Sequence, residues 1–163
     1  MGTRVAVIAD THLPRGSRVL SSECLDELAR ADLILHAGDV TAAPVLELLR
    51  EFAPVQAVHG NMDDPELRAA LPEQLVVEVD GSRIGMLHIP GPAAGRAERL
   101  VERFHGCDAV VYGHTHVPQL EQHRGVWILN PGSPTERRRA PQHSLIVLEV
   151  AETRLNARLV PIA

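Results

Sequence analysis

The sequence contains few aromatic residues and no excess of basic charge. Phenylalanine, tryptophan and tyrosine make up 2% of the 163 residues, so the stacking surfaces that hold single-stranded nucleic acid are poorly supplied. The formal net charge of -5 gives no basic field for binding a polyanion over a broad surface. We therefore expect no generic nucleic-acid binding.

Cysteines and long apolar runs are also scarce. Cys24 and Cys107 are too few and too far apart for a disulfide framework or a cysteine-ligated zinc site, and we expect both thiols to be reduced and buried. The apolar run 5–9 ends at Asp10, too early for a signal-peptide core, and no segment approaches membrane-spanning length. These features predict a soluble cytoplasmic protein without a membrane partner. Association into a homo-oligomer through apolar strand edges stays open.

The chain is long enough for one domain with a substantial core, and we expect residues 1–163 to form it. In its first part, apolar and amphipathic segments alternate. They predict strands over 5–9, 33–35 and 55–58 and helices over 21–30, 44–52 and 65–70. This order favours a parallel sheet covered by helices, with ligands at the carboxyl ends of the strands.

The second part of the sequence is dominated by hairpins. We predict hairpins over 75–88 and 119–130, a helix over 93–104, a strand over 109–112, and a last strand pair over 144–150 and 157–162. Parallel units followed by antiparallel hairpins favour an α/β (α+β) fold of two mixed sheets packed face to face, with helices outside.

Polar side chains that can bind metal follow five of the predicted strands. They are Asp10 and His12, Asp39, Asn61, His88, and His114 and His116. Taken singly, such residues are more often helix caps, turn formers or histidines bonded within the core. Because a sheet brings strand ends together, we interpret the seven as one metal site.

The spacing within this set adds to the interpretation. Asp10 and His12 are two residues apart, as are His114 and His116, and side chains at this spacing on extended backbone point the same way. Each pair is therefore expected to converge on one site. Glycines that would allow tight turns beside the ligands are Gly38, Gly60 and Gly113.

Seven ligands exceed what one small transition ion takes, which indicates two divalent metal ions sharing a bridging carboxylate. Oxygen and imidazole ligands without thiolate suit Mn²⁺, which we expect first, or Fe, Zn, Ni or Co, rather than Ca²⁺ or a structural zinc. Paired ions roughly 3.5 to 4 Å apart are the standard arrangement for displacement at phosphorus.

The order Asp-x-His, Gly-Asp, Gly-Asn, His and Gly-His-x-His resembles that of the calcineurin-like metallophosphoesterases, and the short chain is similar to their small single-domain bacterial and archaeal phosphodiesterase branch. The match covers residues 5 to about 135 and includes the stretch "ILNPGSP". The resemblance implies a four-layer αββα sandwich. It also assigns ligands: Asp10, His12 and His116 to one ion, Asn61, His88 and His114 to the other, with Asp39 bridging.

The resemblance further implies a phosphoesterase, most specifically a phosphodiesterase, acting on a small-molecule or nucleotide phosphate ester. A hydroxide bridging the two ions would attack phosphorus in line. The catalytic residues so implied are Asp39, Asn61, His88 and Asp63. Asp63 matches an acidic residue of the family, which gives it two equally good interpretations: it orients the site, or it caps the helix that begins at Pro65.

Two features depart from the family pattern. Many members place a histidine directly after Gly-Asn, where it can protonate the leaving oxygen, whereas this chain has Met62. A thioether carries no proton, so we expect a preference for esters with good leaving groups. The segment after His88, "HIPGPAAGR", also differs, which leaves the substrate wall undefined.

Three further residues are candidates for supporting roles. His36 and His59 stand shortly before predicted ligands and could hold them by hydrogen bonds, or could be partly buried strand histidines bonded to backbone. Arg15 could contact a substrate phosphate, although a solvated loop arginine is the commoner case.

Two other functions remain as alternatives. A catalytically weak or inactive protein-binding scaffold on the same fold, as in the retromer subunit that resembles this branch, gains support from Met62. A metal-storage or metal-sensing protein would need a second sensing module, which the sequence lacks. The retained set of seven ligands favours the enzyme, because a scaffold has no need of a costly cluster of charged groups.

Overall fold

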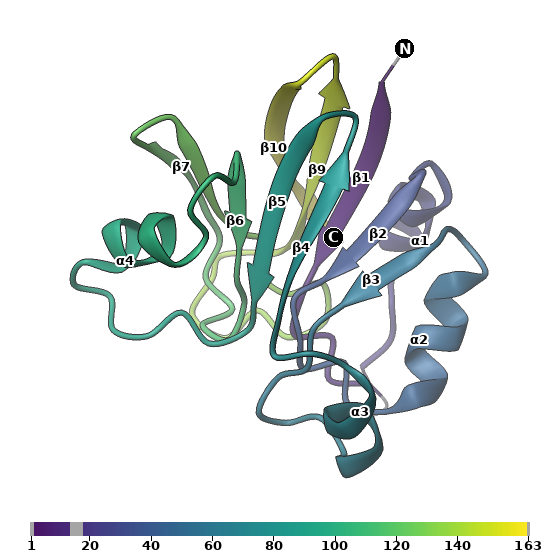
Figure 1. Cartoon of the computed structure of the whole chain (residues 1–163). Helices are drawn as coiled ribbons and strands as arrows, with labels where there is room; N and C mark the ends of the chain where they lie inside the picture. The colour runs from purple at the N-terminus through teal and green to yellow at the C-terminus, as the bar shows by residue number, and fades with distance from the viewer. Residues whose placement is uncertain (1, 14–17, 163) are drawn as a thin grey trace.

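The computed structural model describes residues 2–13 and 18–162, which fold into two five-stranded sheets packed face to face (Figure 1). The first sheet contains β1 (Thr3–Ile8), β2 (Leu33–His36), β3 (Val55–Ala57), β9 (His143–Ala151) and β10 (Arg154–Ile162), in the order β10-β9-β1-β2-β3. The second sheet contains β4 (Gln74–Val79), β5 (Ser82–Leu87), β6 (Ala109–Val111), β7 (Gln119–His123) and β8 (Val126–Asn130), in the order β4-β5-β6-β8-β7.

Both sheets are mixed, as predicted. In the first sheet β1, β2 and β3 run parallel, while β9 pairs antiparallel with β1 and with β10. In the second sheet β5, β6 and β8 run parallel, and β4 and β7 pair antiparallel at the two edges. The parallel pairs β1–β2, β2–β3 and β5–β6 come from β-α-β units and the antiparallel pairs β4–β5, β7–β8 and β9–β10 from hairpins, which confirms the predicted sandwich.

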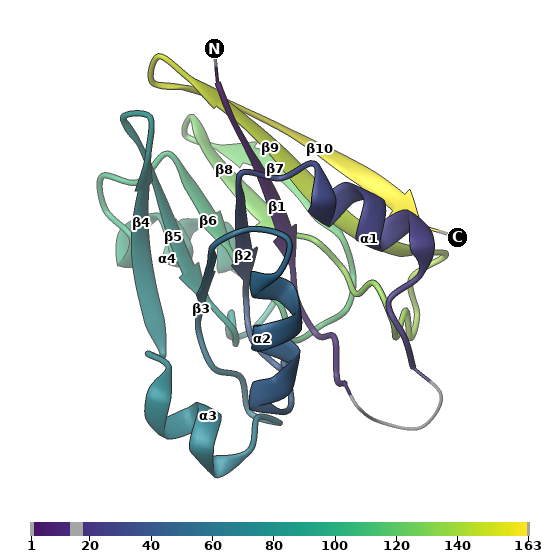
Figure 2. The ribbon, with the colours of Figure 1, turned by 90° about the vertical axis from the view of Figure 1, so that its right-hand side faces the viewer.

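Four helices lie outside the sheets in the described residues: α1 (Ser22–Ala29), α2 (Ala43–Arg50), α3 (Pro65–Ala70) and α4 (Arg96–Arg103). Helices α1 and α2 lie on one side of the sandwich and α4 on the other (Figure 1). Figure 2 shows α1 alongside β10, near the C-terminus. The Ser21 hydroxyl caps α1 by accepting from the Cys24 backbone N–H at 3.2 Å, as the sequence predicts.

The alternation of side chains along β1 divides the core into layers. Val5 and Val7 are fully buried between the two sheets, where Ile84 of β5 also packs. Ala6 and Ile8 face the opposite way and are buried beneath α1 and α2. A third apolar cluster lies between the second sheet and α4 and includes Leu100. These three interfaces define the four layers that the resemblance implies.

The two predicted hairpin turns are confirmed. Asp80 and Gly81 have φ of 45° and 82°, and Arg124 and Gly125 have φ of 53° and 78°, as two-residue turns between twisted strands require. One helix start is wrong: α4 begins at Arg96 rather than near residue 93, because Gly95 precedes it with left-handed backbone. The bounds of the other elements lie within three residues of the predicted ones, and those of α3 are as predicted.

Two further expectations can be compared with the described residues. Cys24 and Cys107 are both buried free thiols, as predicted. Within residues 2–13 and 18–162, the helices are too short and too polar to cross a bilayer.

Candidate metal centre

The structure brings the seven predicted ligands together at the carboxyl ends of the parallel strands. Two groups of side chains have metal-binding atoms within 4.8 Å of one another: Asp10, His12 and His116 form one, and Asp39, His88 and His114 form the other. The seventh residue adjoins the second group, because Asn61 Oδ1 lies 3.2 Å from His114 Nδ1. We call the first group the buried half and the second group, with Asn61, the open half.

The two halves are in contact through their carboxylates. Asp39 Oδ2 lies 3.0 Å from His88 Nε2 in its own half and 3.6 Å from His12 Nε2 in the buried half. Asp10 Oδ1 lies 3.5 Å from His116 Nε2 and 3.6 Å from His88 Nε2 across the boundary. Both carboxylates therefore lie at the boundary between the halves, and each contacts imidazoles of both.

The convergence of these residues has a different cause from the one predicted. Asp10, His12, His114 and His116 are not on extended backbone: their φ angles are 56°, 46°, 75° and 62°. Asp39 also has a left-handed φ of 58°. His114 and His116 converge on the same centre but lie in different halves of it, in the grouping that the resemblance implies. Left-handed conformation is rare for residues other than glycine and tends to occur where the surrounding fold enforces it at functional sites.

The flanking glycines serve mainly to give the ligands room. A Cβ added to Gly38 would lie 2.7 Å from His88 Nδ1, and Gly38 also has a φ of 99°. Gly113 would place a Cβ 2.9 Å from Asp10 Oδ2, and a Cβ on Gly60 would overlap Asp39 Oδ1. Any larger residue at these positions would displace a candidate ligand.

Backbone carbonyls fix which nitrogen each of two imidazoles turns toward the centre. His88 Nδ1–H donates to the Ala37 carbonyl at 2.7 Å, and His116 Nδ1–H donates to the Glu136 carbonyl at 2.6 Å. In both rings Nε2 is left facing the carboxylates, without a proton in the neutral form. This is the arrangement by which proteins orient histidine ligands to metals.

Several buried atoms at the centre make no hydrogen bond within the described residues. They are Asp10 Oδ1, His12 Nε2, His88 Nε2 and His116 Nε2. Their residues are at most 2% exposed. Unsatisfied buried polar atoms are costly, and here four of them point into one space. The donor set, oxygen and imidazole nitrogen, fits divalent transition-metal ions.

The electrostatics of the centre also suit cations. Burial raises the pKa of Asp10, but the imidazoles of His116 and His12 outweigh it, and the net pKa lies below its ordinary value. The pKa of Asp39 is raised by burial and lowered more strongly by His88, so it too is depressed. Burial lowers the pKa of His88, while Asp39 and Asp10 raise it to a net increase. Both carboxylates are therefore ionised at neutral pH.

Asp63 holds two of the loops that carry candidate ligands. Its carboxylate accepts three backbone N–H groups: Gly60 at 2.6 Å, Thr41 at 2.7 Å and Asp39 at 3.2 Å. These bonds tie the loop after β2 to the loop after β3. The helix-cap interpretation of Asp63 is wrong, because Asp64 caps α3 by accepting from the Leu67 N–H at 3.0 Å. Asp63 thus positions Asp39 rather than facing the space between the ligands.

His36 lies under both halves and is fully buried. Its Nδ1 accepts from the Gly38 backbone N–H at 3.1 Å, which leaves Nε2–H to donate to Thr11 Oγ1 at 3.0 Å. Burial lowers the pKa of His36 to about 4, so it is neutral at pH 7. It thereby holds the residue between Asp10 and His12 and the residue before Asp39.

The other two candidates for supporting roles are His59 and Arg15. His59 lines a cavity beside the centre together with His88 and Asn61, and its buried Nδ1 has no hydrogen-bond partner in the described part of the chain. Arg15 lies outside the described residues.

A segment whose role the sequence did not reveal holds the buried half in place. In residues 130–136, which we call the clasp, Ser133 Oγ donates to the Asp10 carbonyl at 2.7 Å and Thr135 Oγ1 to the Thr11 carbonyl at 2.6 Å. Asn130 Nδ2 donates to Thr115 Oγ1 at 2.9 Å, between His114 and His116. The signal for this role was a run of hydroxyl and amide side chains directly after a strand, as in "NPGSPT".

Comparisons with known proteins agree with this geometry. The calcineurin-like phosphoesterase superfamily domain matches residues 3–153. A probable metallophosphoesterase of Methanocaldococcus jannaschii is 39% identical over 161 residues, covering 97% of this chain and 81% of the relative. Another, of Methanothermobacter thermautotrophicus, is 33% identical over 160 residues, covering 96% and 91%. The structure of wild-type Vps29 of Entamoeba histolytica complexed with zinc is similar, with a TM-score of 0.77, 26% identity, and coverage of 97% and 98%.

This chain therefore belongs to the calcineurin-like phosphoesterase superfamily, as the resemblance predicts. The superfamily binds divalent metals and acts on phosphate esters, and this chain carries two groups of side chains that could hold such ions.

Proposed function

We propose that the protein is a metal-dependent phosphodiesterase with two divalent ions at the candidate centre, Mn²⁺ first among them. The observation that carries the proposal is the convergence of four unsatisfied, buried ligand atoms from Asp10, His12, His88 and His116. Asp39 contacts both halves and would bridge the ions. His114 and Asn61 would complete the ligands of the open half.

A bound pair of divalent ions lowers the pKa of water and neutralises charge on a phosphate in the transition state. The chain's own residues supply the geometry for this chemistry. Asp63 and His36 fix the loops that carry Asp39 and Asp10, and carbonyls fix the ring orientations of His88 and His116. No side-chain nucleophile is needed, so the protein's part is placement of the ions and of the substrate.

A diester, rather than a monoester, is favoured by the space beside the centre. A cavity of about 190 Å³ adjoins the open half and is lined by Asn61 and His88, which gives room for a second ester arm. Met62 is 39% exposed next to Asn61 and offers no proton to a leaving group, consistent with activated diesters as the best substrates.

The likeness to Vps29 supports a second candidate function, a protein-binding scaffold on the same fold. Met62 agrees with weak or absent catalysis. The buried charged cluster is harder to reconcile with a scaffold, because ionised groups in this position cost stability unless a cation compensates them.

The test is hydrolysis of bis-p-nitrophenyl phosphate by metal-stripped protein as Mn²⁺ is added, with p-nitrophenyl phosphate as the monoester comparison. We expect metal-dependent cleavage that is faster for the diester. Asp39→Asn should lower the rate by about 10²-fold or more, because it removes the shared carboxylate. Asp26→Asn, an equal charge change on exposed α1, should leave the rate unchanged.

Two results would count against the enzyme. Activity that is equal in Asp39→Asn would remove the candidate centre from catalysis. Two ions bound per chain with no hydrolysis for any of Mn, Fe, Zn, Ni and Co would favour the scaffold.

A further inference from the structure

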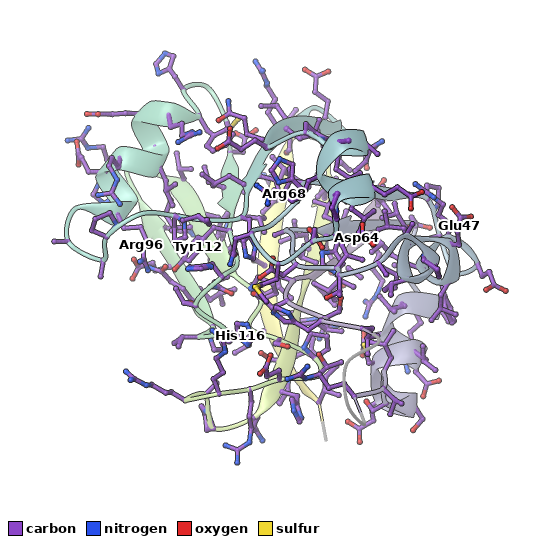
Figure 3. The ribbon with its side chains drawn as sticks, turned by 90° about the horizontal axis from the view of Figure 1, so that it is seen from below. Glu47, Asp64, Arg68, Arg96, Tyr112 and His116 are labelled. Atoms are coloured by element: carbon purple, nitrogen blue, oxygen red, sulfur yellow. The ribbon has the colours of Figure 1, made fainter. Side chains whose placement is uncertain are left out.

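The cavity beside the open half extends away from the candidate ligands into a charged wall. His88 and Asn61 line the end nearest the centre. The remaining wall comes from α3, from the end of α4 and from the segment before β4, with Arg68, Arg103 and Glu73 as its charged residues. Figure 3 shows the molecule from below and labels Arg68 of this wall and His116 of the buried half. The cavity and the centre therefore share His88 and Asn61.

Two arginines in this wall lack acidic partners. In the described part of the chain, neither Arg68 nor Arg103 forms an ion pair, whereas Arg4, Arg18 and Arg50 are each paired with a glutamate at 2.5 to 2.8 Å. With Glu73 counted, the charged groups of the lining sum to one positive charge, on a chain whose net charge is -5. The lining of this cavity therefore carries a net positive charge of one.

One of the guanidinium groups is already oriented. Arg103 Nε donates to Gln74 Oε1 at 2.7 Å, which leaves its two terminal nitrogens for another acceptor. A planar guanidinium with free terminal nitrogens matches the oxygens of a phosphate in two parallel hydrogen bonds. Arg68 of α3 lines the same cavity and brings a second guanidinium to it.

We infer that this cavity binds a second phosphoryl group of the substrate, carried on one arm of the ester. The preferred substrate would then be a short phosphodiester with a terminal phosphate, such as a 5′-phosphorylated dinucleotide. The inference rests on the proposed phosphodiesterase function and adds the substrate class. A diester without the second phosphate would meet the same metal ligands but leave both guanidinium groups in water.

The kinetic test compares two thymidine dinucleotides that differ only in a 5′-terminal phosphate. For metal-loaded wild-type protein we expect kcat/KM to favour the phosphorylated dinucleotide by about tenfold, through KM. The double variant Arg68→Ala/Arg103→Ala should lose this preference. Arg158→Ala, an exposed arginine on the edge strand β10, should retain the preference. Glu73→Gln should increase it, because it removes the opposing charge.

A binding measurement separates this inference from the proposed function. Calorimetry on metal-loaded protein should show thymidine 3′,5′-bisphosphate binding about tenfold more tightly than thymidine 5′-monophosphate, with the ratio near one in the double variant. A ratio unchanged in the double variant overturns the inference, as does an unchanged kinetic preference. If wild-type protein fails to cleave bis-p-nitrophenyl phosphate, the proposed function is overturned instead, and the calorimetric ratio alone decides whether the cavity binds the second phosphate.

Discussion

The buried and open halves of the candidate centre use similar side chains but are held in different ways. Asp10, His12 and His116 are at most 2% exposed. In the open half Asn61 is exposed and His114 is half-buried. The buried half is held by the clasp, whose Ser133 is 123 residues from Asp10 along the chain. In the open half the Asp39 N–H donates to Asp63, only 24 residues further along the chain. This half also borders the cavity.

We infer from this difference that the buried half retains its ion and that the open half contacts the substrate. A site closed by buried hydrogen bonds from a remote segment suits an ion that stays bound. A site with an exposed amide and a half-buried imidazole suits contact with substrate, which must enter and leave. The buried half should therefore depend on the clasp for metal affinity, and the open half on its exposed neighbours for the rate.

Removing the clasp's central hydroxyl should affect the two halves unequally. Ser133 Oγ donates to the Asp10 carbonyl and accepts the Glu136 N–H at 2.9 Å, so Ser133→Ala loosens both Asp10 and the carbonyl that orients His116. We expect the tighter of two metal-binding steps to weaken by about 10- to 100-fold. Calorimetric titration of metal-free protein with Mn²⁺ would measure this.

The matched control is Ser82→Ala. Ser82 is also buried, but it begins β5, five residues before the strand reaches Leu87 and then the ligand His88. Its loss should leave both metal-binding steps unchanged. Equal weakening of both steps in Ser133→Ala would show that the halves are not held separately.

A substitution in the open half should have a smaller effect, and it should be a gain in rate where Ser133→Ala causes a loss of metal affinity. Met62 follows Asn61, and its backbone N–H donates to Asp39 Oδ1 at 2.8 Å, so its side chain is placed beside the centre and is 39% exposed. Met62→His should raise the rate about tenfold for diesters with poor leaving groups and little for p-nitrophenyl esters, because an imidazole can protonate the departing oxygen. The measurement is the dependence of kcat/KM on leaving-group pKa across aryl diesters. The same slope in both proteins would contradict a proton-transfer role for this position.

The fold could be predicted from the sequence because its local signals agree with one another. Alternating apolar and helical segments specify the parallel strands β1 to β3, and Asp80-Gly81 and Arg124-Gly125 specify two hairpins. The start of α4 is predicted less well than the strands. It lies at Arg96 rather than near residue 93, because apolar periodicity does not encode the left-handed conformation of Gly95.

The set of candidate ligands was likewise predictable, but the reason for its geometry was not. Asp10, Asp39 and His88 can be found because they are polar residues that follow predicted strands. The left-handed φ angles at Asp10 and Asp39, in contrast, arise from the surrounding fold. The clasp was missed for a related reason: Ser133 and Asp10 meet only after β8 and β1 have taken their places in different sheets. Contacts between distant segments depend on topology, which single-residue patterns do not carry.

His36 provides a test that uses stability in place of metal affinity or rate, because it lies beneath both halves and makes no hydrogen bond to a ligand side chain. Its pKa is about 4 in the folded chain and about 6.5 when unfolded, so the unfolded state binds more protons between these values. The stability that neutral His36 contributes is therefore complete above pH 6.5 and lost as pH falls toward 4. One proton corresponds to about 1.4 kcal/mol of unfolding free energy per pH unit. Urea unfolding of wild type and His36→Gln, with chelator present, should show the wild-type advantage shrinking across this range. A difference independent of pH would mean that His36 is not held neutral by its burial beneath Thr11 and Gly38.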